Sequence, residues 1–323
     1  MASLKYETAS PYRVVPPPVP NEDVKYIRYE QNFKLTTLTV PPRFGVRAVV
    51  VATPTFTHED IVTKALDHNK GVFCEKPVAQ SYEQTKACYE KAKKVNQPLL
   101  SAFNRRFDPS FSVVKERVQN GEIGKVLTVK VCSRDSPLPS IEYLKKSGRI
   151  FHDCAVHDID MTLYVLGEYP TKVMVMARAN IPEIAEINDY DTVAIMLSFD
   201  SGTIGIIDLN RYSIYGYDQR LEVFGQKGMI KAENQQPIYN VETYTEKDVK
   251  RAPIAYSFPS RYSDGYDLEM VHFLDVLEGK ADLCVDSKDT LAVTRIASAC
   301  EEAVRTGKAV EIKWTKEDLP STR

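Results

Sequence analysis

Between residues 46 and 103, three short apolar segments alternate with two segments that have the pattern of helices. The first apolar segment, 46–52, contains three valines in succession, which is typical of a strand buried on both faces of a parallel sheet. Strands that alternate with helices form right-handed β-α-β units. The order therefore predicts a parallel sheet with strands at 46–52, 72–74 and 99–103, and helices at 57–68 and 81–96.

Beyond residue 125 the pattern changes to that of a mostly antiparallel sheet with a few helices. Apolar and polar residues alternate, and the triplets at 200–202 and 226–228 each end in a glycine that favours a tight turn. A chain of 323 residues is longer than one hydrophobic core usually holds, so a boundary is expected at the turn 121–125. Strands are predicted at 126–133, 172–179, 192–199, 203–210, 221–224 and 229–231, and helices at 109–121, 153–166, 262–278 and 288–306.

The opening 46 residues differ from the rest of the chain. The first glycine of the whole sequence is Gly45, whereas seven prolines precede it. Proline fixes φ and removes a backbone donor, so residues 10–20 are predicted to be extended, polyproline-like chain. Two short strands are predicted at 24–29 and 33–40.

Composition excludes several classes of protein. The net charge of -2 argues against an extended nucleic-acid surface, and no apolar run approaches the ~20 residues that span a bilayer. No secretory signal is apparent at the start of the chain. The six cysteines form no CxxC pair, which is typical of free thiols in a reducing compartment. A cytoplasmic globular enzyme, without nucleic-acid or membrane partners, is expected.

The triplet Glu75-Lys76-Pro77 follows directly after the second predicted strand. In a doubly wound sheet, ligands bind beyond the carboxyl ends of the strands, so Lys76 is expected in that crevice. The loop after the first strand brings Thr53 and His58 to the same edge. The alternative is a surface Glu-Lys pair at a turn, which has no functional meaning.

Four residues that can carry chemistry share one face of the predicted helix 153–166. At ~100° per residue they fall within an arc of about 60°. An aspartate four residues before a histidine can orient the imidazole and raise its basicity, as a general base requires. The alternatives are a capping Asp153, a solvated polar face, or a metal site that includes His152. The four residues are Asp153, His157, Asp160 and Tyr164.

Six segments resemble motifs of the glucose–fructose oxidoreductase / inositol dehydrogenase / MocA family (Gfo/Idh/MocA), and are most similar to its myo-inositol 2-dehydrogenase branch. They span about residues 47–315. The resemblance implies a partial dinucleotide-binding domain at 47–124 and a substrate-binding and oligomerisation domain at 125–323. The fold class is α/β plus α+β: an incomplete doubly wound, Rossmann-like parallel sheet, then a mostly antiparallel sheet with flanking helices. The segments are "VVVATPTFTHEDIV", "GVFCEKPVA", "FNRRFDPSF", "HDCAVHDIDMTLYVLG", "YGYDQRLEVFGQKGM" and "SRYSDGYDLEMVHFLDVLEG".

The resemblance also implies an activity and roles for individual residues. The reaction would be the NAD(P)-dependent oxidation of a secondary hydroxyl of a cyclic polyol, similar to myo-inositol, to a ketone. Lys76 would hold the reacting hydroxyl, and His157 would accept its proton, with Asp153 orienting the imidazole. Three further residues are expected to bind substrate: Arg106, Asp160 and Tyr217.

The expected cofactor is NAD, with NADP not excluded, and no metal is expected. Its predicted contacts are Thr53, Pro54, His58, Glu75 and Lys76. The resemblance further implies a homo-oligomer, a dimer or tetramer, in which the sheet of the second domain packs against its copy.

One departure from the family affects the expected cofactor site. The family opens with a strand and a Gly-x-Gly-x-x-Gly turn that holds the pyrophosphate, but this sequence contains no Gly-x-Gly. Residues 1–46 are therefore expected to match nothing in the first half of that domain, which would be missing or replaced. A catalytically silent chain that keeps only a substrate-binding or oligomerisation role is the alternative.

Overall fold

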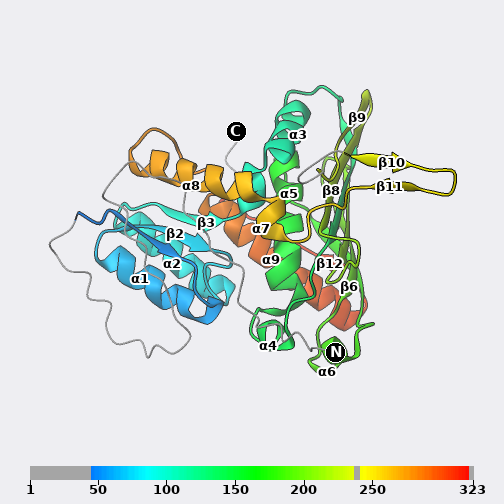
Figure 1. Cartoon of the computed structure of the whole chain (residues 1–323). Helices are drawn as coiled ribbons and strands as arrows, with labels where there is room; N and C mark the ends of the chain where they lie inside the picture. Colours follow the sequence, from blue (N-terminus) through cyan, green and yellow to red (C-terminus); the bar gives the residue numbers. More distant parts are fainter. Residues whose placement is uncertain (1–44, 236–240, 320–323) are drawn as a thin grey trace, which may run out of the picture.

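The computed structural model describes residues 45–235 and 241–319, which form two sheets with helices packed on them (Figure 1). The extended segment predicted at 10–20 and the strands predicted at 24–29 and 33–40 lie outside the described residues. A search of the described residues finds no helix long and apolar enough to cross a membrane.

The smaller sheet has three parallel strands, in the order β1-β2-β3, as predicted. Helix α2 begins where the sequence places it, because the Ser81 side chain accepts a hydrogen bond from the backbone N–H of Gln84 at 3.2 Å. The elements are β1 (Ala48–Val51), a 3-10 turn η1 (Thr55–Thr57), α1 (His58–Asp67), β2 (Gly71–Glu75), α2 (Tyr82–Lys94) and β3 (Leu99–Ala102).

Both faces of the small sheet are covered, which explains why its strands are mostly apolar. Val72 and Cys74 of β2 pack with α1 and α2, whereas Phe73 between them points to the opposite face. There it meets Phe273 of α8 (Ser263–Leu277), with ring centroids 5.7 Å apart. A helix from the C-terminal part of the chain thus completes the core of the first sheet (Figure 1).

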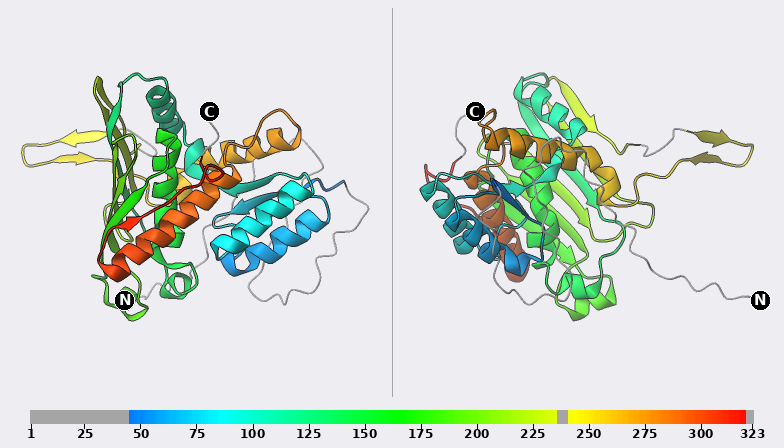
Figure 2. Two further views of the ribbon diagram at one scale, coloured as in Figure 1. Left: turned by 180° about the vertical axis from the view of Figure 1, so that it is seen from behind. Right: turned by 60° about the vertical axis from the view of Figure 1, so that its left-hand side comes forward.

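The larger sheet has seven strands, in the order β12-β5-β6-β7-β4-β8-β9. Neighbours are antiparallel except β4 and β7, which run parallel. Helices α5 and α9 pack on one face, and none of the helices within residues 45–235 and 241–319 lies on the other face (Figure 2). The strands are β4 (Val126–Arg134), β5 (Lys172–Arg178), β6 (Thr192–Ser198), β7 (Ile204–Asn210), β8 (Asp218–Gly225), β9 (Gly228–Ala232) and β12 (Val310–Glu311).

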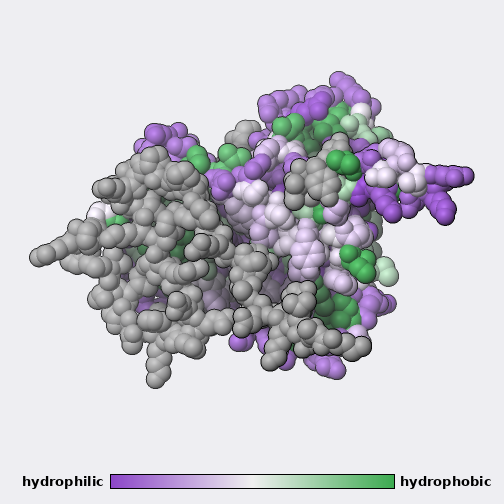
Figure 3. Space-filling view, in the orientation of Figure 1, coloured by the Kyte–Doolittle hydropathy of each residue, from purple (hydrophilic) through white to green (hydrophobic). Residues whose placement is uncertain are grey.

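A two-stranded hairpin of β10 (Glu242–Tyr244) and β11 (Val249–Arg251) projects from the body (Figures 1 and 2). All six of its strand residues are exposed, and its surface is mostly hydrophilic (Figure 3). The remaining elements are the 3-10 turn η2 (Asn104–Phe107), α3 (Pro109–Gln119), α4 (Ile141–Leu144), the π-helical turn η3 (Ile150–Ala155), α5 (Val156–Leu166), α6 (Pro182–Glu186), α7 (Phe258–Arg261) and α9 (Ser287–Thr306).

The helix predicted at 153–166 is α-helical only from Val156. The preceding residues, 150–155, form the π-helical turn η3, in which each turn takes more residues than in an α-helix. Asp153 lies in the π-turn and His157 in the α-helix. Their side chains therefore do not have the relationship of residues four apart in one regular α-helix.

Candidate active site

A cavity of about 620 Å³ lies beyond the carboxyl ends of the three parallel strands, between the two sheets. This volume suits a small organic ligand. Its walls come from the loops after β1 and β2 and from η2 on one side, and from the ends of β4 and β7 and the turn η3 on the other. The predicted site residues that line it are Thr53, Pro54, His58, Glu75, Lys76, Asp153, His157 and Tyr217.

Lys76 connects the small sheet to the turn that carries Asp153. Its Nζ donates to the backbone carbonyl of Asp153 at 2.5 Å and to carboxylate Oδ1 of the same residue at 3.1 Å. Both side chains are largely buried, with exposed fractions of 14% and 8%. The interpretation of Lys76 as part of an exposed turn is therefore wrong, because the side chain lies in the cavity wall.

Asp153 is held by two further donors. Arg211 NH1 donates to Oδ2 at 2.8 Å, and the Tyr143 hydroxyl donates to Oδ1 at 2.8 Å. Burial alone would raise the pKa of Asp153, but the charges of Lys76 and Arg211, with these hydrogen bonds, lower the pKa well below its usual value. The carboxylate therefore stays ionised and anchors the lysine. Sequence reasoning missed Tyr143 and Arg211, because they are 10 and 58 residues away.

His157 is the group that can accept a proton. Burial, with the positive charges of Lys76 and Arg105, lowers its pKa well below the ordinary 6.5, against the opposing charge of Asp153. The imidazole is therefore neutral near pH 7. Its Nδ1 is buried and has no hydrogen-bond partner within 45–235 and 241–319, so the ring edge that carries Nε2 is left to meet the cavity.

The prediction that Asp153 orients His157 directly is not supported by the geometry. The bonds of Asp153 go to Lys76, Tyr143 and Arg211, and none of those found in the described residues goes to His157. The π-helical turn separates the two side chains, and the imidazole packs instead against Phe103, with ring centroids 6.1 Å apart. The charge of Asp153 nevertheless raises the pKa of His157, against the larger effects that lower it.

The prediction that Arg106 and Asp160 bind substrate is wrong. Both are fully buried away from the cavity, and Arg106 donates to both carboxylate oxygens of Asp160, at 2.6 and 3.0 Å. Arg106 also binds Asp289 of α9 at 2.8 Å, and its guanidinium stacks on the ring of Tyr164. Asp160 is three residues beyond His157, so it points ~60° away around the helix. This cluster connects η2, α5 and α9.

Of the two adjacent arginines, Arg105 is the one that lines the cavity. Its NH1 pairs with buried Asp158 at 2.5 Å, and its NH2 approaches the Tyr217 hydroxyl at 3.4 Å. Burial raises the pKa of Tyr217, so its hydroxyl remains protonated. Adjacent residues on a 3-10 turn point ~120° apart, so the "NRRF" segment indicates an arginine here but not which one.

The loops on the cofactor side are fixed by His58. One ring nitrogen contacts the carbonyl of Thr53 and the other that of Pro77, both at 2.7 Å, so the buried ring bridges the loops after β1 and β2. Thr53 in turn shares a 2.6 Å hydrogen bond with Thr57. His58 therefore positions the loops, although it was predicted to contact the cofactor itself.

The alternative metal site does not form in the described part of the chain. His152 lies 3.7 Å from Glu301, outside the cavity wall, while Asp153 is occupied by cationic and hydroxyl donors. Within the described ranges, no group of three or more His, Cys, Asp or Glu side chains is arranged to hold a metal ion.

A parallel β-α-β sheet and a mixed sheet that enclose a lysine and a neutral histidine define a two-domain oxidoreductase of the Rossmann type. Residues 27–103 match the family model described as "Oxidoreductase family, NAD-binding Rossmann fold", and residues 115–312 match "Oxidoreductase family, C-terminal alpha/beta domain". The chain belongs to the Gfo/Idh/MocA oxidoreductase family.

Relatives of known name agree with this assignment. The chain is 38% identical to the inositol 2-dehydrogenase of Rhizobium meliloti over 83% of its own length and 81% of the relative's. It superposes on the myo-inositol dehydrogenase of Corynebacterium glutamicum (TM-score 0.79, 34% identity, 84% and 82% of the chains). It also superposes on the Lactobacillus casei scyllo-inositol dehydrogenase with bound NAD(H) and scyllo-inositol (TM-score 0.76, 26% identity, 82% and 80%).

The comparisons correct one prediction about the N-terminal part. The NAD-binding Rossmann model matches from residue 27, so the expectation that residues 1–46 resemble nothing in that domain is wrong. The predicted loss or replacement of the first half of the domain is therefore not supported. The chain carries the NAD-binding domain of its family.

The cavity fits the reactive end of NAD. Thr53 and Pro54 after β1, and Glu75 and Lys76 after β2, form its edge at the strand ends, where dinucleotides bind in doubly wound sheets. Burial raises the pKa of Glu75, against the opposing charge of Lys76. These residues would hold the nicotinamide and its ribose next to His157.

Proposed function

We propose that this protein oxidises a secondary hydroxyl of a cyclic polyol, of the inositol type, to a ketone with NAD. The observation that carries the proposal is the presence of Lys76 and His157 in one cavity, with Lys76 bound to an ionised Asp153. When a hydroxyl group loses a proton and the adjacent carbon loses a hydride, a neutral imidazole can accept the proton and an ammonium group can stabilise the negative charge on the oxygen. The names of the relatives support inositol as the substrate.

In this mechanism the lysine and the histidine have separate roles. The Nζ of Lys76 donates a hydrogen bond to the reacting hydroxyl oxygen and stabilises negative charge that develops on it. Nε2 of neutral His157 accepts the hydroxyl proton as the carbon–oxygen double bond forms. NAD, when bound, supplies the acceptor for the hydride that leaves the same carbon. Asp153 keeps Lys76 in place and balances its charge.

Charge in the cavity supports an uncharged substrate. Lys76, Arg105 and Arg211 contribute positive charge, but Lys76 is paired with Asp153 and Arg105 with Asp158. Arg211 is paired with Asp153 at 2.8 Å and with a third buried carboxylate, Asp189, at 3.9 Å. No cation of the cavity that lies in the described ranges is therefore left to bind a phosphate or a carboxylate. Hydroxyl groups, which exchange hydrogen bonds without adding charge, suit such walls. Tyr217 is the proposed substrate contact from the second sheet.

The proposal is tested by mixing the protein with NAD and either myo-inositol, scyllo-inositol or glucose, and following NADH by its absorbance. Oxidation of an inositol, with glucose slower, is expected. A thermal-shift titration with NAD runs in parallel, because a working cofactor site raises the melting temperature with ligand concentration. A melting temperature that rises with NAD, but no NADH from any polyol, would exclude the proposed substrate class. No shift with NAD would favour the catalytically silent alternative.

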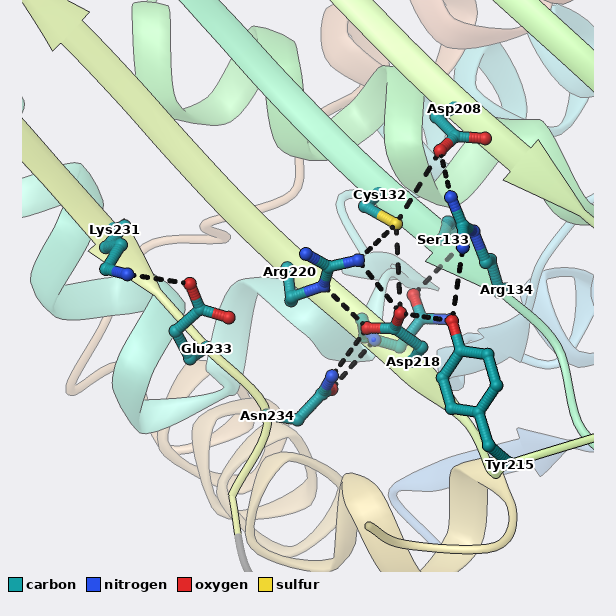
Figure 4. Close-up of polar contacts among 11 residues, drawn as sticks. Cys132, Ser133, Arg134, Asp208, Tyr215, Asp218, Arg220, Lys231, Glu233 and Asn234 are labelled. Atoms are coloured by element: carbon teal, nitrogen blue, oxygen red, sulfur yellow. Dashed lines mark hydrogen bonds and ion pairs between the residues drawn. The ribbon is translucent and has the colours of Figure 1, made fainter. Parts of the chain in front are cut away.

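We further propose that the helix-free face of the large sheet packs against a second copy of the chain. Exposed Met174, Met176 and Met196 form an apolar strip on β5 and β6. Beside them lies a network of opposite charges around Cys132, in which Arg134 pairs with Asp208, and Arg220 with Asp218 (Figure 4). A face with both signs interspersed can complement itself in a two-fold dimer.

Light scattering after size exclusion tests the dimer. The wild type is expected at twice the monomer mass or a multiple of it, and the variant Met176→Lys, at a residue that is 69% exposed, is expected to dissociate.

The six cysteines, none of them in a disulfide, support a reducing compartment such as the cytoplasm as the place of action.

A further inference from the structure

Asn104 is a cavity residue to which neither the sequence motifs nor the mechanism gives a role. It is the first residue of η2, directly after β3, and only 4% of its surface is exposed. Because Asn104 lines the cavity, this small exposed part of its surface faces the cavity. Its side-chain amide makes no hydrogen bond with residues 45–235 or 241–319. The amide oxygen and nitrogen are not fully enclosed by these residues.

An amide in this position has unused capacity for hydrogen bonds. Asparagine offers two N–H donors and one carbonyl acceptor, and polar groups buried in proteins nearly always find partners. An apolar side chain of the same size would fill the same space but could form none of these hydrogen bonds. The amide is therefore suited to a partner that enters the cavity, and a hydroxyl group, which both donates and accepts, complements both of its ends.

The backbone around Asn104 is fixed, so its side chain is presented in one direction. Helix α8 packs directly on it: a Cβ added at Gly265 would stand 3.1 Å from the Asn104 carbonyl oxygen. On the next residue, Arg105 is locked by its ion pair with Asp158. The side chain is thus placed in advance and needs little ordering when a ligand binds.

The residues on either side of Asn104 indicate which ligand it meets. Phe103 packs edge-on against the imidazole of His157, and Arg105 approaches the hydroxyl of Tyr217 at 3.4 Å. Asn104 is therefore flanked in the chain by one residue that contacts the proposed base and by one that approaches the proposed substrate tyrosine. The strand register, in which Glu75 is opposite Ala102, also brings it near the lysine loop.

We propose that the amide of Asn104 hydrogen-bonds a hydroxyl of the polyol other than the one that is oxidised, so that Asn104 determines which polyol is accepted. This inference rests on the proposed function, because it assigns a subsite within the same cavity. In this role Asn104 contacts a part of the polyol that does not react, unlike Lys76 and His157, which act at the carbon that is oxidised. Its removal should affect recognition of one hydroxyl and leave NAD binding unchanged.

The test compares the wild type with Asn104→Leu, which keeps the volume and removes the hydrogen bonds. For myo-inositol, kcat/KM is expected to fall about 10-fold, the usual effect of one neutral hydrogen bond of ~1.4 kcal/mol. A panel of monodeoxyinositols is assayed with both proteins. The analogue that lacks the bound hydroxyl should be a poor substrate of the wild type, yet lose little further with the variant. Asn120→Leu, at an exposed helix end, is the matched control.

Two results would overturn the inference. One is an equal loss with every analogue, which indicates a general structural effect; the other is a weaker affinity for NAD with the affinity for polyol unchanged. NAD affinity and melting temperature are measured for each variant, and Asn104→Asp, which keeps size and an acceptor, provides a second folded variant. If the wild type oxidises no inositol, the subsite is tested apart from the reaction: inositol is titrated by calorimetry into the NADH complexes of the wild type and of Asn104→Leu. An affinity lowered by Asn104→Leu then supports the subsite, and no binding or no change refutes it.

Discussion

Lys76 Nζ lies 2.5 Å from the carbonyl oxygen and 3.1 Å from the carboxylate of Asp153, although 77 residues separate the two in the chain. The bond joins the end of β2 in the small sheet to the π-helical turn beside the large one. The lysine thus reaches the cavity in a fixed direction, with its charge balanced by an aspartate that three donors hold. The proposed oxidation depends on this arrangement.

The first prediction concerns Lys76 itself. Lys76→Met keeps much of the apolar stem but removes the charge and the hydrogen bonds. If the ammonium stabilises negative charge on the reacting oxygen, kcat should fall by about 100-fold or more, and by a larger factor than NAD affinity, to which Lys76 would contribute only one of several contacts. Steady-state NADH formation and an NAD titration measure both. Lys64→Met, at an exposed ion pair with Asp60, is the control and should retain full activity. Full activity of the Lys76 variant would contradict the mechanism.

The second prediction concerns the pH dependence of stability that His157 contributes. Its pKa in the folded protein lies well below 6.5, so below pH 6.5 the unfolded chain binds a proton that the folded chain does not. The free energy of unfolding therefore decreases as the pH falls below 6.5. His157→Gln cannot bind this proton in either state, so its loss of stability between pH 7 and pH 5 should be smaller, by at most about 2 kcal/mol. Urea unfolding at the two pH values measures the difference. An identical pH dependence in both proteins would show that the imidazole is not held neutral.

The sequence predicted most of the fold because burial leaves a direct mark on it. Three valines in succession are typical of a strand that is covered on both sides, and the alternating strands of the larger sheet reflect one covered face and one open face. What covers the second face of the small sheet could not be predicted. The contact of Phe73 with Phe273 joins residues 200 positions apart, and no local pattern records such a pairing.

For the site, the sequence located the two groups that are proposed to react but not the residues that support them. Lys76 and His157 lie in recognisable motifs, whereas Arg211 and Tyr143 reach Asp153 from other elements. The error over Arg106 has a different cause. The roles of two adjacent arginines cannot be told apart from the sequence, because the geometry of the turn decides which of the two faces the cavity.

The third prediction follows from that correction. Arg106→Met leaves Asp160 and Asp289 buried without their cation, so the free energy of unfolding should fall by about 3–5 kcal/mol. In the protein that remains folded, KM for the polyol should be unchanged. Arg105→Met also breaks a buried pair, but it lines the cavity and should raise KM. Urea unfolding and steady-state kinetics at low temperature separate the two effects. A raised KM for Arg106→Met would restore the original interpretation of Arg106 as a substrate contact.

The fourth prediction concerns the backbone just before the π-helical turn. Arg149 has φ 65° and ψ 180°, a region that only glycine adopts readily and that costs other residues about 1–3 kcal/mol. Among the residues that the structure describes, its side chain makes only an exposed ion pair with Glu301, at 3.4 Å, which contributes little. Arg149→Gly should therefore stabilise the protein by about 1 kcal/mol, after the greater freedom of glycine in the unfolded chain is subtracted. Asn188→Gly, at φ 55°, is the control with a smaller expected gain, because asparagine tolerates the left-handed region. Urea unfolding compares the three proteins, and a less stable Arg149 variant would mean that the arginine side chain stabilises the turn by more than its backbone strain costs.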